Sequence, residues 1–409
     1  MPSNLSQSPR TRNDEFVPSR AAGLLRLADF LPSAGQRYAA TRNFDYGDRE
    51  RGNVSGLSPY LRRRMVTERE VVAAVLSRHS YADAEKFVQE VLWRTYWKGW
   101  LEMRPSVWRS YVEDREARAA DLEGSRELED AEAGRTGIDG FDEWARELVQ
   151  TGYLHNHVRM WFASIWIFTL RLPWSLGADF FERHLLDADP ASNTLSWRWV
   201  AGLQTVGKSY LATTENIRRY TDGRYAPRGL ATVAIPMAEA PLPPAAPLAL
   251  TPIHGLGATS PVILIVTPED LNPEMIFGAG SEVSHVLLLS EGSQTGKLAR
   301  DFTVKAVEDA AARIRQKVNC SVDIIDGLEA DTLMQAASRA GVGSFITPYA
   351  PVGPIADSLH DAAETLRAEG KSLRRVSRTW DERFWPRANK GFFAFKQSIP
   401  ALIAQELDS

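Results

Sequence analysis

Apolar residues recur at a spacing of three and four along the first half of the chain. This spacing gathers them on one face of a helix, and polar residues fill the other face. It predicts helices over residues 21–31, 68–78, 82–103, 140–150 and 155–172. No stretch of this half alternates convincingly with period two, so we predict an all-α domain.

The second half shows a different pattern, in which short apolar runs alternate with helical stretches. The runs cover residues 262–266, 285–289, 322–325, 344–347 and 373–376, and the helical stretches cover 302–316, 330–340 and 355–369. Nearly all-apolar strands separated by helices predict a parallel sheet covered on both faces. The predicted fold class is therefore an all-α domain followed by a doubly wound, Rossmann-like α/β domain.

The predicted α/β domain contains neither a G-x-G-x-x-G motif nor a Walker phosphate loop. The nearest string, Phe277-Gly-Ala-Gly-Ser281, has no strand directly before it and is predicted to be a turn.

Proline marks the boundary between the two halves, because it removes amide donors and favours extended backbone. We predict a flexible tail over 1–20, a helical domain over 21–232, a Pro/Ala-rich linker over 233–260 and an α/β domain over 261–409.

Composition excludes several kinds of site. The 409 residues include one cysteine, Cys320, which excludes a disulfide framework, a cysteine-ligated zinc site and a four-cysteine iron–sulfur cluster. No metal site is expected. A net charge of -4 argues against coating nucleic acid through global charge and leaves room for a local basic patch. The polar start and the absence of a long apolar run predict a cytoplasmic protein away from membranes, and we expect a monomer.

Residues 151–199 hold the densest candidate chemistry. Asp187 and Asp189 stand near an Asn and an Arg, where they could bind a polar cofactor or could simply cap a helix and form a turn. Ten of the twelve tryptophans lie before residue 200, as core residues or as the wall of a cofactor site.

Four strings settle which protein family the first half resembles. They are GLSPYLRRR, EVLWRTYWKGW, TGYLHNHVRM and DADPASNTLSWRW, in that order. Their order and spacing resemble the FAD-binding helical domain of the DNA photolyase and cryptochrome family, over residues 21–225. The α/β half resembles the family's antenna domain more loosely, over 331–401, and that domain ordinarily comes first. The resemblance therefore implies a circularly permuted domain order.

The resemblance implies a set of FAD contacts. Val54 stands where a threonine is usual. Arg159 would pair with Asp187 against the isoalloxazine ring, or the two could form an ordinary buried ion pair; Asp189 would contact the flavin or its ribose. Asn193 would face flavin N5. The remaining implied contacts, with the phosphates, the ribityl chain and other parts of FAD, are Tyr38, Ser55, Leu57, Ser58, Arg94 and Asn156.

The resemblance also implies an electron path. Trp197 and Trp174 match the first two tryptophans that pass an electron to photoexcited flavin, and the alignment leaves the third open. Its candidates are Trp100, Trp108, Trp144 and Tyr96.

Positions on the substrate side favour the branch that repairs cyclobutane pyrimidine dimers, because the histidines of the (6-4) branch are absent at Asn156 and Met160. A flipped lesion needs aromatic walls and polar groups that reach the base edges. The implied pocket residues are Glu90, Trp93, Asn156, Met160 and Trp199, with Arg42 on the DNA side.

Other basic residues admit two interpretations. Arg62–Arg64 and Arg218–Arg219 are expected to contact DNA phosphates or to form solvated helix faces. His157 stands where an arginine that touches DNA is common in the family.

The resemblance implies a light-driven, FAD-dependent lyase of the deoxyribodipyrimidine photolyase type, with damaged single-stranded or duplex DNA as its partner. A pterin or deazaflavin antenna chromophore could accompany the FAD. The alternatives are a cryptochrome-like photoreceptor that photoreduces FAD and signals without repair, and a flavin-free helical scaffold. The complete set of Arg159, Asp187, Asp189 and Asn193 disfavours the scaffold.

Overall fold

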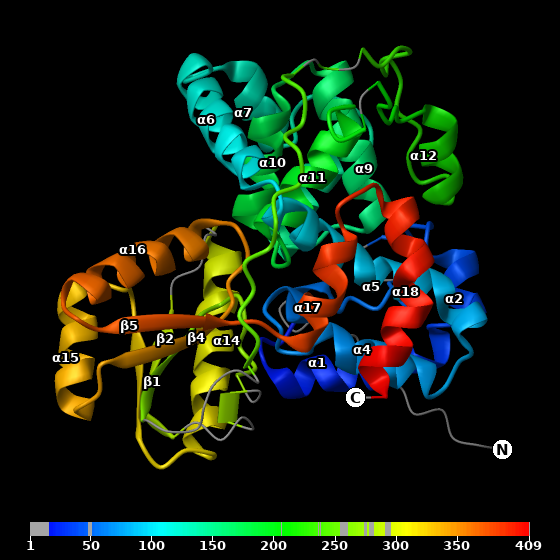
Figure 1. Ribbon diagram of the computed structural model, residues 1–409. Coiled ribbons are helices and arrows are strands. Elements are labelled where there is room, and N and C mark those ends of the chain that lie inside the picture. Colours follow the sequence, from blue (N-terminus) through cyan, green and yellow to red (C-terminus); the bar gives the residue numbers. More distant parts are fainter. Residues whose placement is uncertain are drawn as a thin grey trace.

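A computed structural model describes residues 16–47, 51–205, 207–235, 237, 239–253, 261–273, 276–277, 282–290 and 296–408. Figure 1 shows a body of helices beside a smaller body built on a sheet. The first fifteen residues of the predicted tail and most of the predicted turn at 277–281 lie outside the described residues.

The helical part matches the predicted helices closely and adds several short ones. Polar caps explain the starts of many of them: Ser19 caps α1, Thr67 closes a capping box on α4 and Ser80 caps α5. The elements are α1 (Arg20–Phe30), η2 (Leu31–Ser33), α2 (Gln36–Thr41), α3 (Ser58–Arg62), α4 (Glu68–Leu76), α5 (Tyr81–Glu102), α6 (Pro105–Asp121), α7 (Arg126–Glu132), α8 (Phe141–Thr151), α9 (Asn156–Ser164), η3 (Ile165–Thr169), α10 (Trp174–His184), α11 (Pro190–Val200) and α12 (Thr214–Tyr220).

The helix predicted over 155–172 is the one whose form differs from the prediction. Its second half, η3, is a π-helix, in which the amide of Leu170 donates to the carbonyl of Ile165 at 2.9 Å. A π-turn inserts one residue into the helical repeat, and so re-aims the side chains that follow.

The α/β part contains five parallel strands in the order β3-β2-β1-β4-β5. Each predicted strand is present within two residues of its predicted ends. The elements are β1 (Val262–Val266), β2 (Val283–Leu289), α14 (Lys297–Arg315), β3 (Ser321–Ile325), α15 (Ala330–Ala340), β4 (Ser344–Pro348), α16 (Pro354–Ala368) and β5 (Ser372–Val376).

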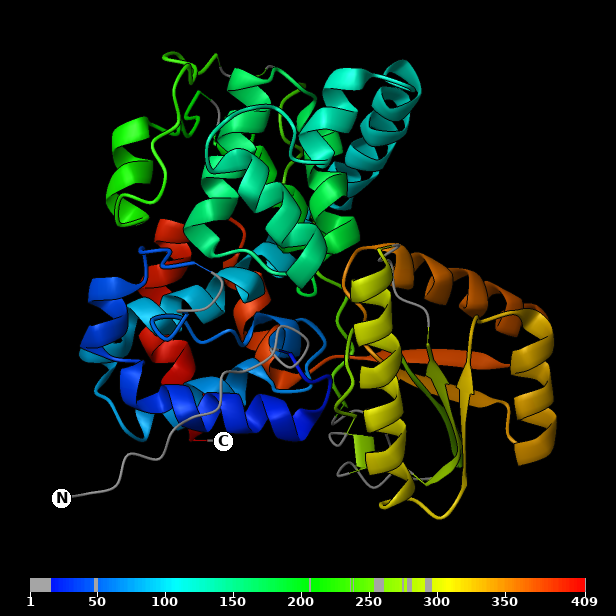
Figure 2. The same cartoon turned by 180° about the vertical axis from the view of Figure 1, so that it is seen from behind.

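Successive apolar residues of β1 point to opposite faces of the sheet and pack into two different cores. Leu264 and Val266 belong to the core that includes α14, whereas Ile263 and Ile265 belong to the core under α15 and α16. Figure 2 shows α14 on one side of the sheet and α15 and α16 on the other. The core on the α14 side is continuous with that of the helical part. The predicted fold class is confirmed.

The last helices leave the sheet and return to the helical part, which the predicted limits of 261–409 did not anticipate. They are α17 (Thr379–Phe384), η5 (Trp385–Arg387) and α18 (Phe392–Leu407), and α17 and α18 pack beside α4 and α5 (Figure 1). Trp380 Nε1 donates to Thr95 Oγ1 at 3.1 Å, and Tyr96 Oη donates to the carbonyl of Lys390 at 2.8 Å.

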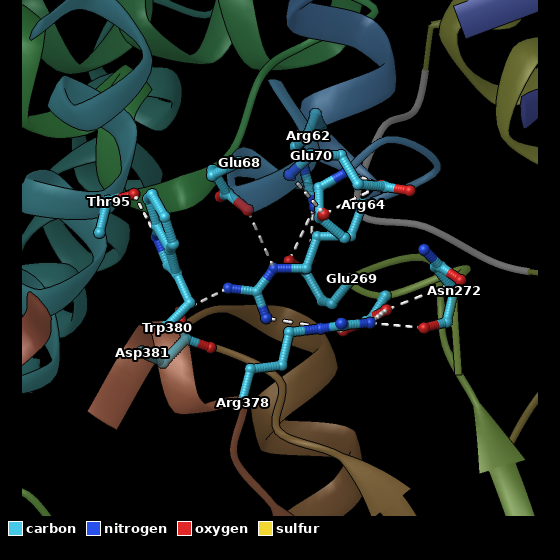
Figure 3. A network of polar contacts seen from close by, with 12 residues as sticks. Arg62, Arg64, Glu68, Glu70, Thr95, Glu269, Asn272, Arg378, Trp380 and Asp381 are labelled. Atoms are coloured by element: carbon cyan, nitrogen blue, oxygen red, sulfur yellow. Dashed lines mark hydrogen bonds and ion pairs between the residues drawn. The ribbon is translucent and has the colours of Figure 1, made fainter. Parts of the chain in front are cut away.

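Arg62, Arg63 and Arg64 lie buried at the junction of the two parts, so the expectation that they contact DNA phosphates is wrong. They are 2%, 1% and 2% exposed. Figure 3 shows Arg62 and Arg64 within a network that reaches Glu269 and Asp381. Buried guanidinium groups need such partners, because an unpaired buried charge is costly. Within the described residues, no helix is long and apolar enough to cross a membrane.

Candidate functional site

A cavity of about 580 Å³ opens in the helical part, between α5, α9, α11 and the loop that precedes α3. This volume lies in the range of cofactor and ligand sites. All the predicted cofactor and substrate residues line the cavity, from Tyr38 on α2 to Trp199 on α11; Trp174 lies outside its lining. The structure thus brings together side chains from five separate segments of the sequence.

The connection between α10 and α11 carries the two carboxylates. Asp187 Oδ2 accepts from Arg159 Nη2 at 2.9 Å, and Asp189 pairs with Arg94. Asp189 is also the N-cap of α11, since it accepts from the amide of Ser192 at 2.9 Å. The helix-cap interpretation of Asp189 is therefore confirmed, and its contact with a cofactor stays a prediction.

Electrostatics keeps both carboxylates ionised. Burial by itself would raise the pKa of Asp187, but the nearby Arg159 and Arg94 hold it below its ordinary value. For Asp189, burial is likewise outweighed by Arg94 and Lys98, and its pKa is lowered.

The cavity wall contains polar atoms that still need partners. Asp187 Oδ1 and Ser192 Oγ are buried and have no hydrogen-bond partner among the described residues, although both residues line the cavity. Buried polar atoms in native proteins are nearly always satisfied. A polar ligand in the cavity would satisfy them, and the residues present fit FAD in this respect.

The loop before α3 forms the side of the cavity near Tyr38. Asn53 anchors it by donating to the carbonyls of Thr41 and Phe44 at 2.9 and 2.7 Å. Gly56 has a φ of +60°, and a Cβ there would lie 2.6 Å from Arg26 Nη1. Glycine is thus required at this turn, which presents Ser55 and Ser58 to the cavity.

Several substrate-side residues already have protein partners. Glu90 pairs with Arg42, and the ring of Trp93 stacks on Phe392 of α18 at 3.4 Å between centroids. Burial raises the pKa of Glu90, and Arg42 offsets part of this effect. Phe392 went unnoticed in the sequence, because the contact joins residues about 300 positions apart.

Aromatic rings extend from the cavity into the core. The ring centroids of Trp197 and Trp166 lie 6.2 Å apart. On another path, the centroid of Trp174 lies 5.5 Å from that of Tyr111, which in turn lies 5.2 Å from that of Trp108. Of the candidates for the third tryptophan, Trp108 is thus joined to Trp174 through one ring.

The other candidates have different neighbours. Trp144 stacks on Trp161, Arg104 lies over Trp100, and Tyr96 contacts Trp93. Trp166 and Tyr111 were missed, because an aromatic inside an apolar helix looks like any core residue in sequence.

The remaining basic and imidazole groups lie around α9 and α12. His157 Nδ1 is 2.9 Å from the carbonyl oxygen of Asn43, and its ring stacks on Trp161. Arg218 and Arg219 on α12 are exposed, so their expected role toward DNA stays a prediction. Among the described residues, no group of three or more His, Cys, Asp or Glu side chains could hold a metal ion.

Comparison with known proteins shows what the helical part of the chain is similar to. Residues 87–226 match the FAD-binding domain of DNA photolyase, and this range includes α9, α10 and α11 with their cavity residues. The helical part of the chain thus contains a domain similar to the FAD-binding domain of the DNA photolyase family. The chain is 32% identical over 193 residues to a deoxyribodipyrimidine photo-lyase of Agrobacterium fabrum, and the alignment covers 46% of this chain and 40% of that protein. A photo-lyase of Alkalihalophilus pseudofirmus is 33% identical over 196 residues, covering 45% and 38%.

The chain spans about 40% of the length of the curated relatives that it matches. Among solved structures, a bacterial class III photolyase from Agrobacterium tumefaciens is 28% identical to this chain, with a TM-score of 0.42. The alignment covers 51% of this chain and 46% of the photolyase chain.

Proposed function

We propose that this protein binds FAD in the cavity of its helical part and uses it for light-driven repair of cyclobutane pyrimidine dimers in DNA. The observation that carries the proposal is the cavity itself, which collects the implied cofactor and substrate residues around the ion pair between Arg159 and the buried carboxylate of Asp187. FAD, when bound, supplies the absorption of blue light and the electron that splits the dimer.

The residues around the carboxylates orient the cofactor. Asp187 offers a buried acceptor oxygen, and Ser192 offers a hydroxyl that can donate or accept. Asn193 is held in place by donating through Nδ2 to the carbonyl of Ala178 at 2.7 Å. Its carboxamide therefore keeps one orientation without flavin, which preorganises the site.

The substrate side supplies aromatic walls and a carboxylate. Trp199 stacks on Tyr210 at 5.7 Å, and Phe392 supports Trp93, so both indoles are fixed by neighbours. Fixed rings lose little conformational entropy when a flipped base stacks on them. Glu90 would accept from the base edge, with Arg42 holding its carboxylate.

A repair assay tests this proposal. The flavin-loaded, reduced protein is expected to restore thymine absorbance in dimer-containing single strands under blue light. Single strands are the better substrate, because extrusion of a base from duplex DNA costs a few kcal/mol. The double variant Glu90→Ala/Asn156→Ala is expected to lower the yield and keep its flavin. Glu116→Ala, an exposed change on α6, is the control.

Normal photoreduction of the flavin, without binding or repair of either strand form, would contradict the proposal. That result would support a photoreceptor of the cryptochrome kind.

An absorption band in the near ultraviolet, beyond those of flavin, would identify the antenna chromophore that we also propose. We further propose that the domain order is circularly permuted.

A further inference from the structure

Three arginines hold three successive carbonyls of the segment that carries the cavity carboxylates. Arg63 donates to the carbonyl of Leu186, Arg94 to that of Asp187 at 3.2 Å and Arg62 to that of Ala188 at 2.6 Å. Backbone carbonyls fixed in this way determine where the side chains between them point. The direction of Asp187 and Asp189 therefore depends on these guanidinium groups.

Two of the three arginines are oriented by the α/β part. Arg62 Nη1 and Nη2 donate to the two carboxylate oxygens of Glu269, each at 2.7 Å. Arg63 Nη2 donates to Thr303 Oγ1 on α14 at 2.6 Å, and its guanidinium lies 5.0 Å from the ring centre of Phe302. Figure 3 shows Glu269 reaching toward Arg62 from the segment that follows β1.

Both partners of the arginines in the α/β part are buried. Glu269 is 5% exposed and Thr303 is 1% exposed, so water cannot replace either partner. A bidentate carboxylate also fixes the plane of a guanidinium, which a single contact would not do. Arg62 can then present its Nε to Ala188 in one direction only.

We propose that Glu269 and Thr303 are positioning residues for the flavin site: by orienting Arg62 and Arg63, they aim the carboxylates of Asp187 and Asp189 into the cavity. The inference rests on the proposed binding of FAD there. It gives the α/β part a role in shaping the cofactor site, in addition to any role as an antenna.

Two nearly isosteric variants and one matched control test the inference in the full chain. Glu269→Gln removes the charge, and Thr303→Val removes the hydroxyl. The control is Asp270→Asn, which removes the neighbouring buried charge that faces Arg378 and Arg64. The donors to the 186–188 carbonyls are other arginines. FAD titration of the apoprotein, the visible flavin spectrum and the melting temperature of the apoprotein are measured for each.

We expect Glu269→Gln to weaken FAD binding about tenfold and to shift the flavin spectrum, with a smaller effect of the same kind for Thr303→Val. Asp270→Asn is expected to lower the melting temperature while leaving the FAD affinity within about twofold. Unchanged affinity and spectrum in both Glu269→Gln and Thr303→Val would overturn the inference.

A double variant separates positioning from stability. Arg62→Met/Glu269→Leu replaces the buried ion pair by apolar side chains, which commonly restores stability. It removes the hydrogen bond from Arg62 to the carbonyl of Ala188, so we expect a recovered melting temperature without recovered FAD affinity. Recovery of both would contradict the positioning role.

Hydrogen exchange in the apoprotein distinguishes failure of this inference from failure of the proposed function. Exchange of the amides at 187–189 is expected to be faster in Glu269→Gln than in Asp270→Asn. If the parent chain did not bind FAD, this difference would still show that Glu269 positions the carboxylate segment. Equal exchange in the two variants would count against the inference whether or not FAD binds.

Discussion

Asp187 is the residue whose chemistry matters most for the proposed cofactor site. Its side chain is 2% exposed, and its charge is balanced by Arg159, which is 23% exposed. Asp187→Asn removes the charge without changing the volume and leaves Arg159 uncompensated beside the cavity. We expect FAD binding to weaken by about 2 kcal/mol, or roughly 30-fold, measured by flavin titration of the apoprotein.

Asp142→Asn is the control for this change, because Asp142 is a buried carboxylate that caps a loop through Thr136 and Gly137. It is expected to lower stability while keeping the FAD affinity of the parent. Full flavin occupancy in Asp187→Asn, with unchanged stability, would contradict the role proposed for the pair.

Among the cavity residues, Trp197 is proposed to be the electron donor nearest to the flavin. Trp197→Phe keeps an aromatic ring but loses the easily oxidised indole, so photoreduction with an external reductant is expected to slow strongly. Trp385→Phe, at a buried indole that contacts Tyr349, is the control and should leave the rate unchanged. The pre-reduced Trp197→Phe variant should still repair DNA, because the dimer receives its electron from the flavin.

Trp166 and Trp174 then compete as the second donor. Trp166 contacts Trp197 directly, whereas Trp174 leads through Tyr111 to Trp108. The variant Trp166→Phe or Trp174→Phe with the slower photoreduction identifies the path.

At the scale of elements, the close approach of α10 and α11 depends on Gly177. A Cβ at this position would lie 2.9 Å from Trp166 Nε1 and well inside the contact distance of the Trp197 ring. Neither ring can move aside easily, because both are buried. Gly177→Ala is therefore expected to cost about 1–3 kcal/mol of unfolding free energy, measured by chemical denaturation.

Gly391→Ala is the control for this overpacking, because no atom lies within 4 Å of its Cβ position. It should leave the unfolding free energy within about 0.5 kcal/mol of the parent value. If Gly177→Ala were equally neutral, the two helices would have to be more loosely packed than described.

At the scale of the whole molecule, Glu102 joins the two parts. It ends α5, and it accepts from Tyr349 Oη at 2.7 Å and from the amide of Val352, both just beyond β4. Burial raises the pKa of Glu102 from 4.5 to about 7, although the two hydrogen bonds act in the opposite direction. Asp381 raises this pKa further, and Lys98 lowers it.

A raised pKa makes stability depend on pH. Between about pH 4.5 and pH 7, folded Glu102 holds a proton that the unfolded chain has released. Its contribution to the free energy of unfolding therefore falls as the pH rises through this window, and it levels off above it. Across the window, the free energy of unfolding changes by about 3 kcal/mol. Glu102→Gln is expected to remove this pH dependence in denaturation measured from about pH 5 to pH 8. An unchanged slope in Glu102→Gln would assign the dependence to another group, and Glu116→Gln is the exposed control.

The sequence by itself determined the two fold classes, the strands to within two residues and many of the residues that line the cavity. Helical and strand periodicities depend on neighbours along the chain, and the four family strings fix the order of the site segments. Asp187, Asp189 and Asn193 could thus be assigned to one cavity before any coordinates were known.

Only the tertiary structure decided what those residues touch. Arg62–Arg64 have the sequence of an exposed basic stripe, yet they are buried because Glu269, Thr303 and Asp381 meet them from the other part of the chain. Likewise, Phe392 lies on Trp93 because α18 returns to the helical part. Charge and apolarity are properties of a residue type, but burial and pairing depend on segments hundreds of residues away, which local periodicity does not record.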